Sequence, residues 1–513
     1  MSLIASYISG ISLLGIPAEI YTYGTQYWMS IISKGFVSLT IALGYLPVFY
    51  TLQITSSYEY LNLRFNNTVR MLGSILFLTK MMLYIPIVIY VPALAFSQVT
   101  GFNLHLITPI VCVVCIFYTT LGGLKAVVWT DTVQTIVMFG GLIIVVVVGT
   151  MNVGGLSVIY ERNLQSDRFE FFNMNLDPTI RHTFWTVSIG NYFAWLAACS
   201  VNQAMVQRCL SMPSLKSAYV TLVILLFGLL ALVSMSCYAG LLIFATYYDC
   251  DPVTTKQISK SDQLLPYFVM RIASGIPGLS GMFISGVFSA ALSSMSTGLN
   301  SMTGVIYEDL IKPRCKTPMS EGKASFIMKI IVFIIGCVCV GLVFVVEKLG
   351  MLIQASVSMA SITAGPLLGL FTLGMFIPAA NAIGALVGGI TGLSLVTWMS
   401  IGTQVYMANG AISFPQKVVS VSGCSENWSL NNTYAPSTYS EPIETPFFLY
   451  QISYMYYTPI GALTVLIVGM SVSFITGCNK NKVLDKNLFS PLIHRFIREN
   501  KKSNIKDTKM EMQ

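Results

Sequence analysis

The chain has 513 residues, of which 54% are hydrophobic and only 10% are charged, and its mean hydropathy is +0.71. Soluble domains carry about 25% charged residues, so this composition excludes a soluble globular protein. The net charge of +8 resides in large part in the basic segment after residue 478, and nucleic-acid binding is not expected of so apolar a chain.

Apolar runs of about 20 residues, each long enough to cross a hydrocarbon core of about 30 Å, recur along the whole sequence. They lack the two-residue alternation that is typical of β-barrel strands. We therefore predict an all-α polytopic membrane protein with about 12 transmembrane helices. The predicted spans are 2–22, 31–52, 70–98, 104–121, 127–150, 183–206, 218–246, 276–307, 325–346, 350–377, 382–402 and 451–476.

The spans group as five, five and two, which suggests two inverted repeats. Transporters built from such repeats carry interrupted helices at matching places in the two halves. Gly10 interrupts the first span, and Gly190 with a polar centre at Ser200 and Asn202 interrupts the sixth. The expected units are a first repeat (1–150), an extracellular loop (151–182), a second repeat (183–378), two additional helices with a glycosylated extracellular loop at 403–450 (379–478), and a basic cytoplasmic tail (479–513).

Loop charges favour a cytoplasmic N-terminus, although the outer loops also carry positive residues. The sequons at Asn427 and Asn431 require an extracellular location and are predicted glycosylation sites. With this topology Cys250 and Cys424 are both extracellular, which makes them candidates for a disulfide.

Hydroxyl side chains crowd the eighth span, in ALSSMSTGLNS (291–301). Small residues allow membrane helices to pack closely, and the same hydroxyls are hard oxygen ligands for a cation. Ser293 and Ser294 can offer two oxygens to Na⁺, and the Ala290 carbonyl can offer a third. The remaining oxygens must come from a loosened backbone elsewhere, for which the interrupted first span is the candidate.

Nine segments together resemble the sodium/solute symporter family, and most closely its monocarboxylate and multivitamin transporter branches. The resemblance extends to about residue 480 and implies a LeuT-type fold of two inverted five-helix repeats. The segments are LGIPAEIYTYGTQYW (14–28), LPVFYTLQITSSYEYLNLRFN (46–66), YTTLGGLKAVVWTDTVQT (118–135), RHTFWT (181–186), VNQAMVQRCLS (201–211), DQLLPYFV (262–269), ALSSMSTGLNS (291–301), YEDLIKP (307–313) and GPLLGLFTLG (365–374).

Family members usually carry one more helix before the first core helix, whereas this sequence begins directly at the core span. Two interpretations stay open: an incomplete gene product, or loss of that helix. With twelve spans both termini face the cytoplasm.

The resemblance implies a sodium site between the first and eighth core helices. By motif, its ligands are the carbonyls of Ala5, Ile8 and Ala290 and the hydroxyls of Ser293 and Ser294. Some members use a second sodium near the substrate, and Ser9 and Ser12 match positions implicated there.

Asp131 lies near the inner end of the fifth span. One interpretation is a carboxylate at the membrane–water boundary, but an acid within a span is costly and is a functional candidate by default. The matching aspartate of the family lies on the cytoplasmic exit route of sodium, so we favour a coupling role.

The substrate is expected beside the sodium, near the midplane. The sugar and iodide transporters have a glutamine where this chain has Ser12, so the resemblance implies an organic anion such as lactate, nicotinate, pantothenate or biotin. For Lys80 two interpretations remain, a side chain that snorkels to the interface or a counter-charge for a carboxylate. The candidate contacts, each also explicable as a packing residue, are Ser12, Lys80, Tyr84, Tyr90, Asn202, Gln203 and Gln354.

We predict a sodium-coupled symporter that moves a small organic anion, such as lactate or nicotinate, across the plasma membrane by alternating access. The alternatives are a sodium-dependent biotin or pantothenate transporter, and a non-transporting sodium-dependent sensor or channel. An enzyme is not expected, because none of the three histidines has a plausible catalytic partner. The expected partners are the solute, the co-transported Na⁺ and the lipid bilayer.

Overall fold

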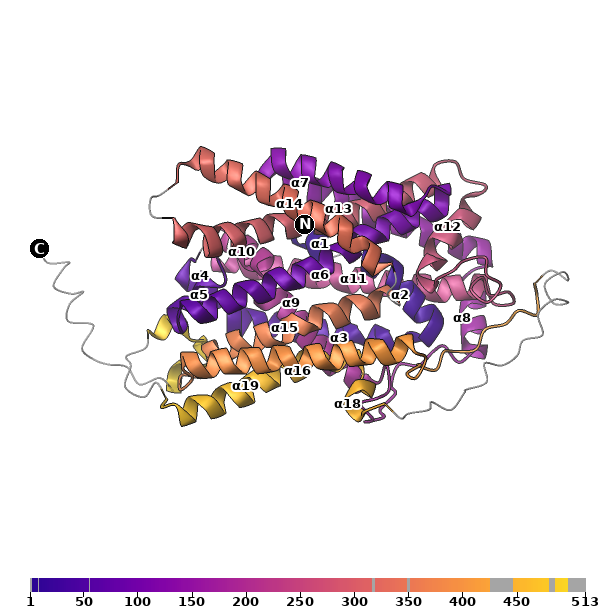
Figure 1. Ribbon diagram of the computed structural model, residues 1–513. Coiled ribbons are helices and arrows are strands. Elements are labelled where there is room, and N and C mark those ends of the chain that lie inside the picture. The colour runs from indigo at the N-terminus through magenta and orange to yellow at the C-terminus, as the bar shows by residue number, and fades with distance from the viewer. Residues whose placement is uncertain are drawn as a thin grey trace, which may run out of the picture.

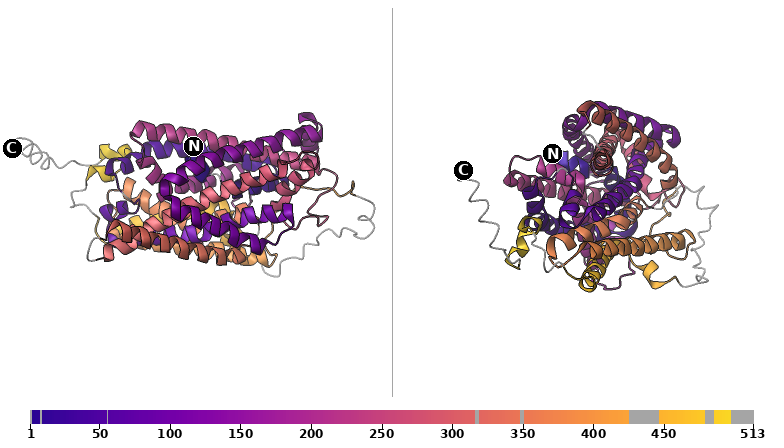
Figure 2. Two further views of the ribbon diagram at one scale, coloured as in Figure 1. Left: turned by 90° about the horizontal axis from the view of Figure 1, so that it is seen from above. Right: turned by 60° about the vertical axis from the view of Figure 1, so that its left-hand side comes forward.

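The computed structural model describes residues 2–7, 9–54, 56–315, 319–347, 351–424, 446–478 and 485–496. Long helices lie side by side along one direction (Figure 1), and an oblique view shows them grouped into a bundle (Figure 2). The described helices are α1 (Ser2–Tyr7), α2 (Gly10–Tyr23), α3 (Ser30–Thr40), α4 (Leu46–Leu52), α5 (Glu59–Arg64), α6 (Asn67–Thr100), α7 (Leu104–Val153), α8 (Leu156–Gln165), α9 (Asn191–Ser200), α10 (Gln203–Leu210), α11 (Leu215–Thr246), α12 (Leu264–Ala273), α13 (Leu279–Val305), α14 (Glu321–Val346), α15 (Leu352–Phe376), α16 (Ala382–Ala408), α18 (Phe448–Gln451) and α19 (Tyr457–Ile475).

Within these ranges, nine stretches of helix are long and apolar enough to cross a membrane. A tenth candidate is the shorter apolar helix Leu104–Phe117. The pairs α1–α2 and α9–α10 are each one predicted span in two pieces, and neither piece reaches the length of a span. Counted in this way, the described helices agree with the prediction of about twelve spans.

The helix α7 is continuous over Leu104–Val153, where we predicted two spans, 104–121 and 127–150. Both spans are present as separate apolar stretches, the shorter helix Leu104–Phe117 and the longer stretch Trp129–Val153. Only the predicted break in the helix between them is absent. At 1.5 Å per residue, a helix of 50 residues is about 75 Å long, which is more than one span requires.

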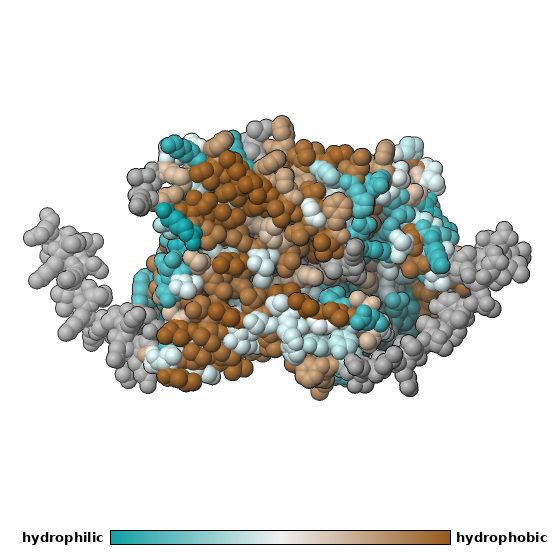
Figure 3. All heavy atoms as spheres, in the orientation of Figure 1, coloured by the Kyte–Doolittle hydropathy of each residue, from teal (hydrophilic) through white to brown (hydrophobic). Residues whose placement is uncertain are grey.

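The surface of the bundle matches a lipid environment. Apolar residues cover the middle of the visible face, and hydrophilic residues gather towards its two ends (Figure 3). Large apolar side chains from several helices are more than half exposed, as expected where lipid replaces water as the solvent. Examples are Phe117, Trp129, Phe227, Phe333 and Ile467.

Small residues bring α15, α16 and α19 into close contact. A Cβ atom added to Gly388 would lie 2.8 Å from the carbonyl oxygen of Val465, and one added to Gly365 would lie 2.7 Å from that of Thr458. Membrane helices associate largely through such close packing, because lipid supplies no hydrophobic drive between them. These three helices form one rigid side of the bundle.

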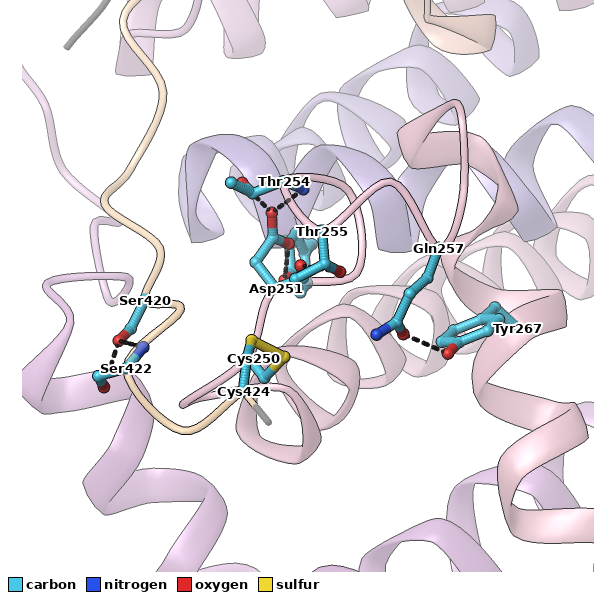
Figure 4. Close-up of a disulfide and its surroundings, with 10 residues drawn as sticks. Cys250, Asp251, Thr254, Thr255, Gln257, Tyr267, Ser420, Ser422 and Cys424 are labelled. Carbon is cyan, nitrogen blue, oxygen red and sulfur yellow. Dashed lines mark hydrogen bonds between the residues drawn. A yellow bond between two sulfur atoms is a disulfide. The ribbon is translucent and has the colours of Figure 1, made fainter. Parts of the chain in front are cut away.

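A disulfide joins two loops at one end of the bundle. Cys250 follows α11, and Cys424 ends the described loop after α16 (Figure 4). Next to it, the Asp251 amide donates a hydrogen bond to the Ser420 carbonyl at 3.0 Å. The two predicted glycosylation sites, Asn427 and Asn431, lie outside the described residues. The segment 485–496 lies at the opposite end of the bundle, beside α4 and α5 (Figure 1).

Removing the disulfide is expected to destabilise this end of the protein. Replacing Cys250 and Cys424 by serine should cost about 2–4 kcal/mol, because a long loop gains freedom in the unfolded chain. The thermal midpoint of the purified protein measures this loss. Cys315→Ser is the matched control, since Cys315 is an exposed free cysteine. Equal midpoints for all three proteins would contradict the prediction.

Candidate functional site

The first interruption lies between α1 and α2. Ser9 has an extended backbone (φ −99°, ψ 159°) and is the N-cap of α2. Its carbonyl accepts the amide of Ser12 at 3.0 Å, which starts the new helix. The break falls next to Gly10, where the sequence predicted it. Ile8 lies outside the described residues.

The second interruption lies between α9 and α10, at Val201 and Asn202. Asn202 has an extended backbone (φ −79°, ψ 128°), and its side chain accepts the amide of Ala204 at 3.1 Å, so it caps α10. Gly190 does not break the chain, since it ends a π-helical turn that continues into α9. The polar pair at the centre of the span, rather than the glycine, marks the break.

The two interrupted helices contact each other through Tyr7, the last residue of α1. Its hydroxyl donates to the Ala198 carbonyl at 2.9 Å, in the last turn of α9 before the break. Helix α1 also packs against α13, which carries Ala290, Ser293 and Ser294. The segment predicted to supply the Ala5 carbonyl and the helix predicted to supply the hydroxyls are therefore neighbours.

The two serine hydroxyls differ in their partners. Ser293 Oγ donates to Asp131 Oδ1 at 2.5 Å, which leaves its lone pairs available to a cation. Ser294 Oγ is buried and has no hydrogen-bond partner among the described residues. A buried oxygen without a partner is costly, and a bound Na⁺ would satisfy it. The donor set thus fits the predicted sodium site.

Asp131 is fully buried on α7 and joins three helices. Besides Ser293 on α13, it accepts a hydrogen bond from Arg208 Nη2 on α10 at 3.1 Å. The same Arg208 nitrogen donates to the Thr297 hydroxyl at 2.8 Å. Asp131 is therefore a carboxylate paired inside the bundle, near the start of the candidate span Trp129–Val153, and it orients the proton of Ser293.

A cavity of about 210 Å³ lies between the interrupted helices, α6, α13 and α15. Among the described residues that line it, Lys80 carries the only full charge, and its side chain points into the bundle rather than to the interface. Six of the residues predicted for sodium or substrate line this cavity: Ser9, Ser12, Lys80, Tyr84, Asn202 and Ser294.

Three predicted substrate contacts lie elsewhere. Gln203 Oε1 accepts the amide and the hydroxyl of Ser57, at 2.6 and 2.8 Å. Tyr90 accepts a hydrogen bond from Lys260 at 3.3 Å, and Gln354 accepts one from Arg181. Each faces a polar neighbour away from the cavity, because the rotation of its helix brings that neighbour within reach.

Arg181 is the centre of a buried network that connects α2 and α15. Its Nε and Nη2 bind the two carboxylate oxygens of Glu19 at 2.7 and 2.9 Å, and it also donates to Gln354. Arg181 and His182 line a second cavity of about 700 Å³ together with residues 410–417. Because Glu19 lies on α2 and Gln354 on α15, the network joins these two helices.

Asp262, in the loop before α12, fixes the start of α15. Its Oδ2 accepts the amide of Leu352 at 3.0 Å. Burial raises the pKa of the Asp262 carboxyl to about 7. The adjacent Lys260 donates to the Glu347 carbonyl at 2.6 Å. Together these contacts hold the loop before α12 against the start of α15, the helix that carries Gln354, and against the end of α14.

Sequence reasoning missed the partners of the predicted residues. Arg208 stands in VNQAMVQRCLS, and Glu19 and Arg181 stand in two other quoted segments, yet none was assigned a role. The available signal was an ionisable residue close to or inside an apolar span, which is a functional candidate by default. Pairing across the bundle depends on contacts between distant segments, and a single sequence does not contain these.

Two helices interrupted inside the bundle, with a charged cavity between them, are the arrangement that is typical of a secondary transporter. The model of the Sodium:solute symporter family matches residues 1–392. The chain belongs to this family, whose members are transporters and not enzymes.

Curated relatives match almost the whole chain. Sodium-coupled monocarboxylate transporter 2 of Mus musculus is 39% identical over 97% of this chain and 80% of its own length. Sodium-coupled monocarboxylate transporter 1 of Homo sapiens is 40% identical over 94% of this chain and 81% of its own. The sodium-dependent multivitamin transporter of Oryctolagus cuniculus is 40% identical over 97% of this chain and 78% of its own.

Solved structures confirm the fold. A Na⁺-coupled sialic acid symporter in a substrate-bound outward-open state has a TM-score of 0.72 and 23% identity, over 94% of this chain and 90% of its own. Mhp1, a nucleobase-cation-symport-1 family transporter, has a TM-score of 0.53 and 12% identity, over 93% and 91%. The predicted LeuT-type inverted-repeat fold is thereby confirmed.

If Ser294 binds sodium, Ser294→Ala should raise the sodium concentration for half-maximal transport about tenfold, since one lost ligand to a charge is worth about 1.5 kcal/mol or more. Sodium titration of uptake measures this. Ser296→Ala is the matched control, because Ser296 is a buried hydroxyl of the same helix that donates to the Ser293 carbonyl. An unchanged sodium dependence in Ser294→Ala would remove Ser294 from the site.

Proposed function

We propose that the protein is a sodium-coupled symporter of small monocarboxylates, with lactate and nicotinate as the model solutes. The observation that carries this is Lys80, an ammonium group that lines the central cavity. No carboxylate lies within ion-pair distance of it among the described residues. A buried cation needs a counter-charge, and a carboxylate solute would supply it.

The size of the cavity favours a short solute. The cavity volume of about 210 Å³ suits lactate or the single ring of nicotinate, which are smaller than biotin and pantothenate. Biotin and pantothenate remain the alternative solutes, because a sodium-dependent multivitamin transporter is also among the relatives.

The proposed sodium ligands are the carbonyls of Ala5, Ile8 and Ala290 and the hydroxyls of Ser293 and Ser294. Sodium between the first and eighth core helices holds them together and stabilises the outward-open state. The solute then binds with its carboxylate at Lys80, near the hydroxyls of Ser12 and Tyr84. The repeats rock, and both leave on the inner side beside Asp131.

Opening to the outside requires the Arg181–Glu19–Gln354 network to separate, because it joins α2 to α15 above the cavity. The two further helices, α16 and α19, pack on α15, and α19 contributes Thr458 to the lining of the cavity. We assign the protein to the plasma membrane, with its disulfide-bonded loops and the sequons Asn427 and Asn431 outside and its basic tail in the cytoplasm.

The test is uptake of labelled lactate, nicotinate, biotin and pantothenate by cells that express the chain, with and without sodium. We expect sodium-dependent uptake of the first two. Uptake of biotin or pantothenate instead would establish the multivitamin alternative. Sodium currents without solute accumulation would indicate a channel or sensor, and uptake indifferent to sodium would contradict the proposal.

Lys80→Gln should raise the half-saturating nicotinate concentration by tenfold or more, since a hydrogen bond to a charged group is worth about 1.5–3 kcal/mol. Dose–response uptake, normalised to surface protein, measures the change. Lys323→Gln, at an exposed position of α14, is the control for loss of a positive charge. Unchanged affinity and selectivity in Lys80→Gln would indicate that Lys80 does not bind the solute and only packs in the bundle.

A further inference from the structure

A second lysine lies inside the bundle, and sequence reasoning assigned it no role. Lys34 is on α3 and only 2% exposed. Its ammonium donates to the carbonyl and hydroxyl oxygens of Ser30, each at 3.2 Å. No carboxylate lies within ion-pair distance of Lys34 in the described part of the chain. Ionisable groups inside a membrane bundle are costly, so one that persists is a candidate for function.

The third contact of Lys34 is aromatic and leads to the central cavity. Its Nζ lies 5.2 Å from the ring centroid of Trp195 on α9, within the range of a cation–π interaction. Trp195 lines the cavity together with Lys80, whereas Lys34 does not line it. The charge of Lys34 is therefore one aromatic side chain away from the proposed solute.

Both ammonium groups are close to the same side chain of α9. Lys80 lines the cavity together with Trp195, and Lys34 contacts the Trp195 ring without lining the cavity. The described cavity lining contains no aspartate or glutamate. Lys80 faces the cavity and Lys34 lies next to its Trp195 wall, so their positive charges repel each other, and an anion in the cavity relieves this repulsion. A neutral solute of the same shape offers no such relief.

The interaction is large enough to decide selectivity. At an effective dielectric constant of about 20, the Lys34 ammonium and a solute carboxylate about 8 Å away would attract each other strongly enough to change the affinity for the solute tenfold or more. The desolvated position of Lys34 also protects the interaction from screening by salt. The attraction needs no direct contact with the solute.

We propose that Lys34 is a specificity-determining residue of the central cavity, which favours carboxylates over their neutral analogues by attraction across Trp195. This assignment rests on the proposed function, because it takes the solute to be an anion held at Lys80. Lys80 binds the carboxylate directly, whereas Lys34 attracts it across the Trp195 side chain without contact and so increases the selectivity for carboxylates.

The test compares nicotinate with nicotinamide, which has the same ring and no charge. Binding of each to the purified full chain in sodium is measured by ligand-dependent thermal stabilisation. Lys34→Met keeps the length of the side chain and removes its charge. It should weaken nicotinate binding about tenfold and leave nicotinamide binding unchanged. Lys34→Arg should keep the selectivity of the wild-type protein.

Two further variants keep the result interpretable. Lys34→Gln repeats the loss of charge with a polar side chain that can still bind Ser30, in case Lys34→Met folds poorly. Ser30→Ala removes one hydrogen-bond acceptor of Lys34 and keeps its charge, so it should keep the selectivity. A structural role for Lys34 would instead weaken the binding of both ligands equally, and would do so in Ser30→Ala as well.

The outcomes separate the two proposals. An unchanged nicotinate-to-nicotinamide ratio in Lys34→Met and Lys34→Gln, or equal weakening of both ligands, overturns the assignment of Lys34. Carboxylate-selective binding that is lost in these variants, in a wild-type protein with no sodium-dependent nicotinate uptake, overturns the proposed transport and supports the role of Lys34.

Discussion

Both halves of the bundle contain a helix that stops inside a medium without water, and the central site depends on how those ends are satisfied. Unpaired backbone groups at this depth are tolerated only where they are buried in protein or line a cavity. Tyr7 of α1 donates to the Ala198 carbonyl of α9, and Asn202 caps α10 with its own side chain. Each break is thus partly satisfied by the other interrupted helix or by its own cap.

Near these breaks, some polar side chains lack a protein partner or keep free lone pairs, and such groups can bind a ligand. Ser294 Oγ has no partner among the described residues, and Ser293 directs its proton to Asp131 so that its lone pairs are available. Arg208 balances the charge of Asp131 from the first turns after the second break. Because α10 begins at Asn202, the same interruption places both the cap and the arginine.

The architecture was predictable because a membrane-spanning helix is an apolar run of about 20 residues, which can be recognised from the sequence alone. The spans and both interruptions follow from apolar length, Gly10 and the polar pair at Ser200 and Asn202. Both spans predicted within α7 are present, and only the break between them is absent, because the helix continues from Leu104 to Val153.

The quoted family segments did not decide which candidate residues reach the cavity. Lys80 lies in none of these segments and lines the cavity, whereas Gln203 lies in one and faces Ser57. Ser9, Ser12 and Ser294 also line the cavity, and Gln354 faces Arg181. A single sequence gives the position of a residue along a helix but not the rotation of that helix or its neighbours. Polar residues near a break were therefore placed at the correct depth but not always on the correct face.

The charges of the cavity give a physical account of coupling. In the proposed arrangement Na⁺ binds at Ser294 and the carboxylate at Lys80, and both residues line one cavity. Sodium alone adds a second positive charge beside Lys80, with no acid in the described lining to offset it. A carboxylate offsets both charges, so each ligand favours the binding of the other, and by linkage the effect is equal in both directions. In the proposed arrangement Lys34 strengthens the attraction for the carboxylate. The Asp131–Arg208 ion pair keeps the net charge beside the sodium site close to zero.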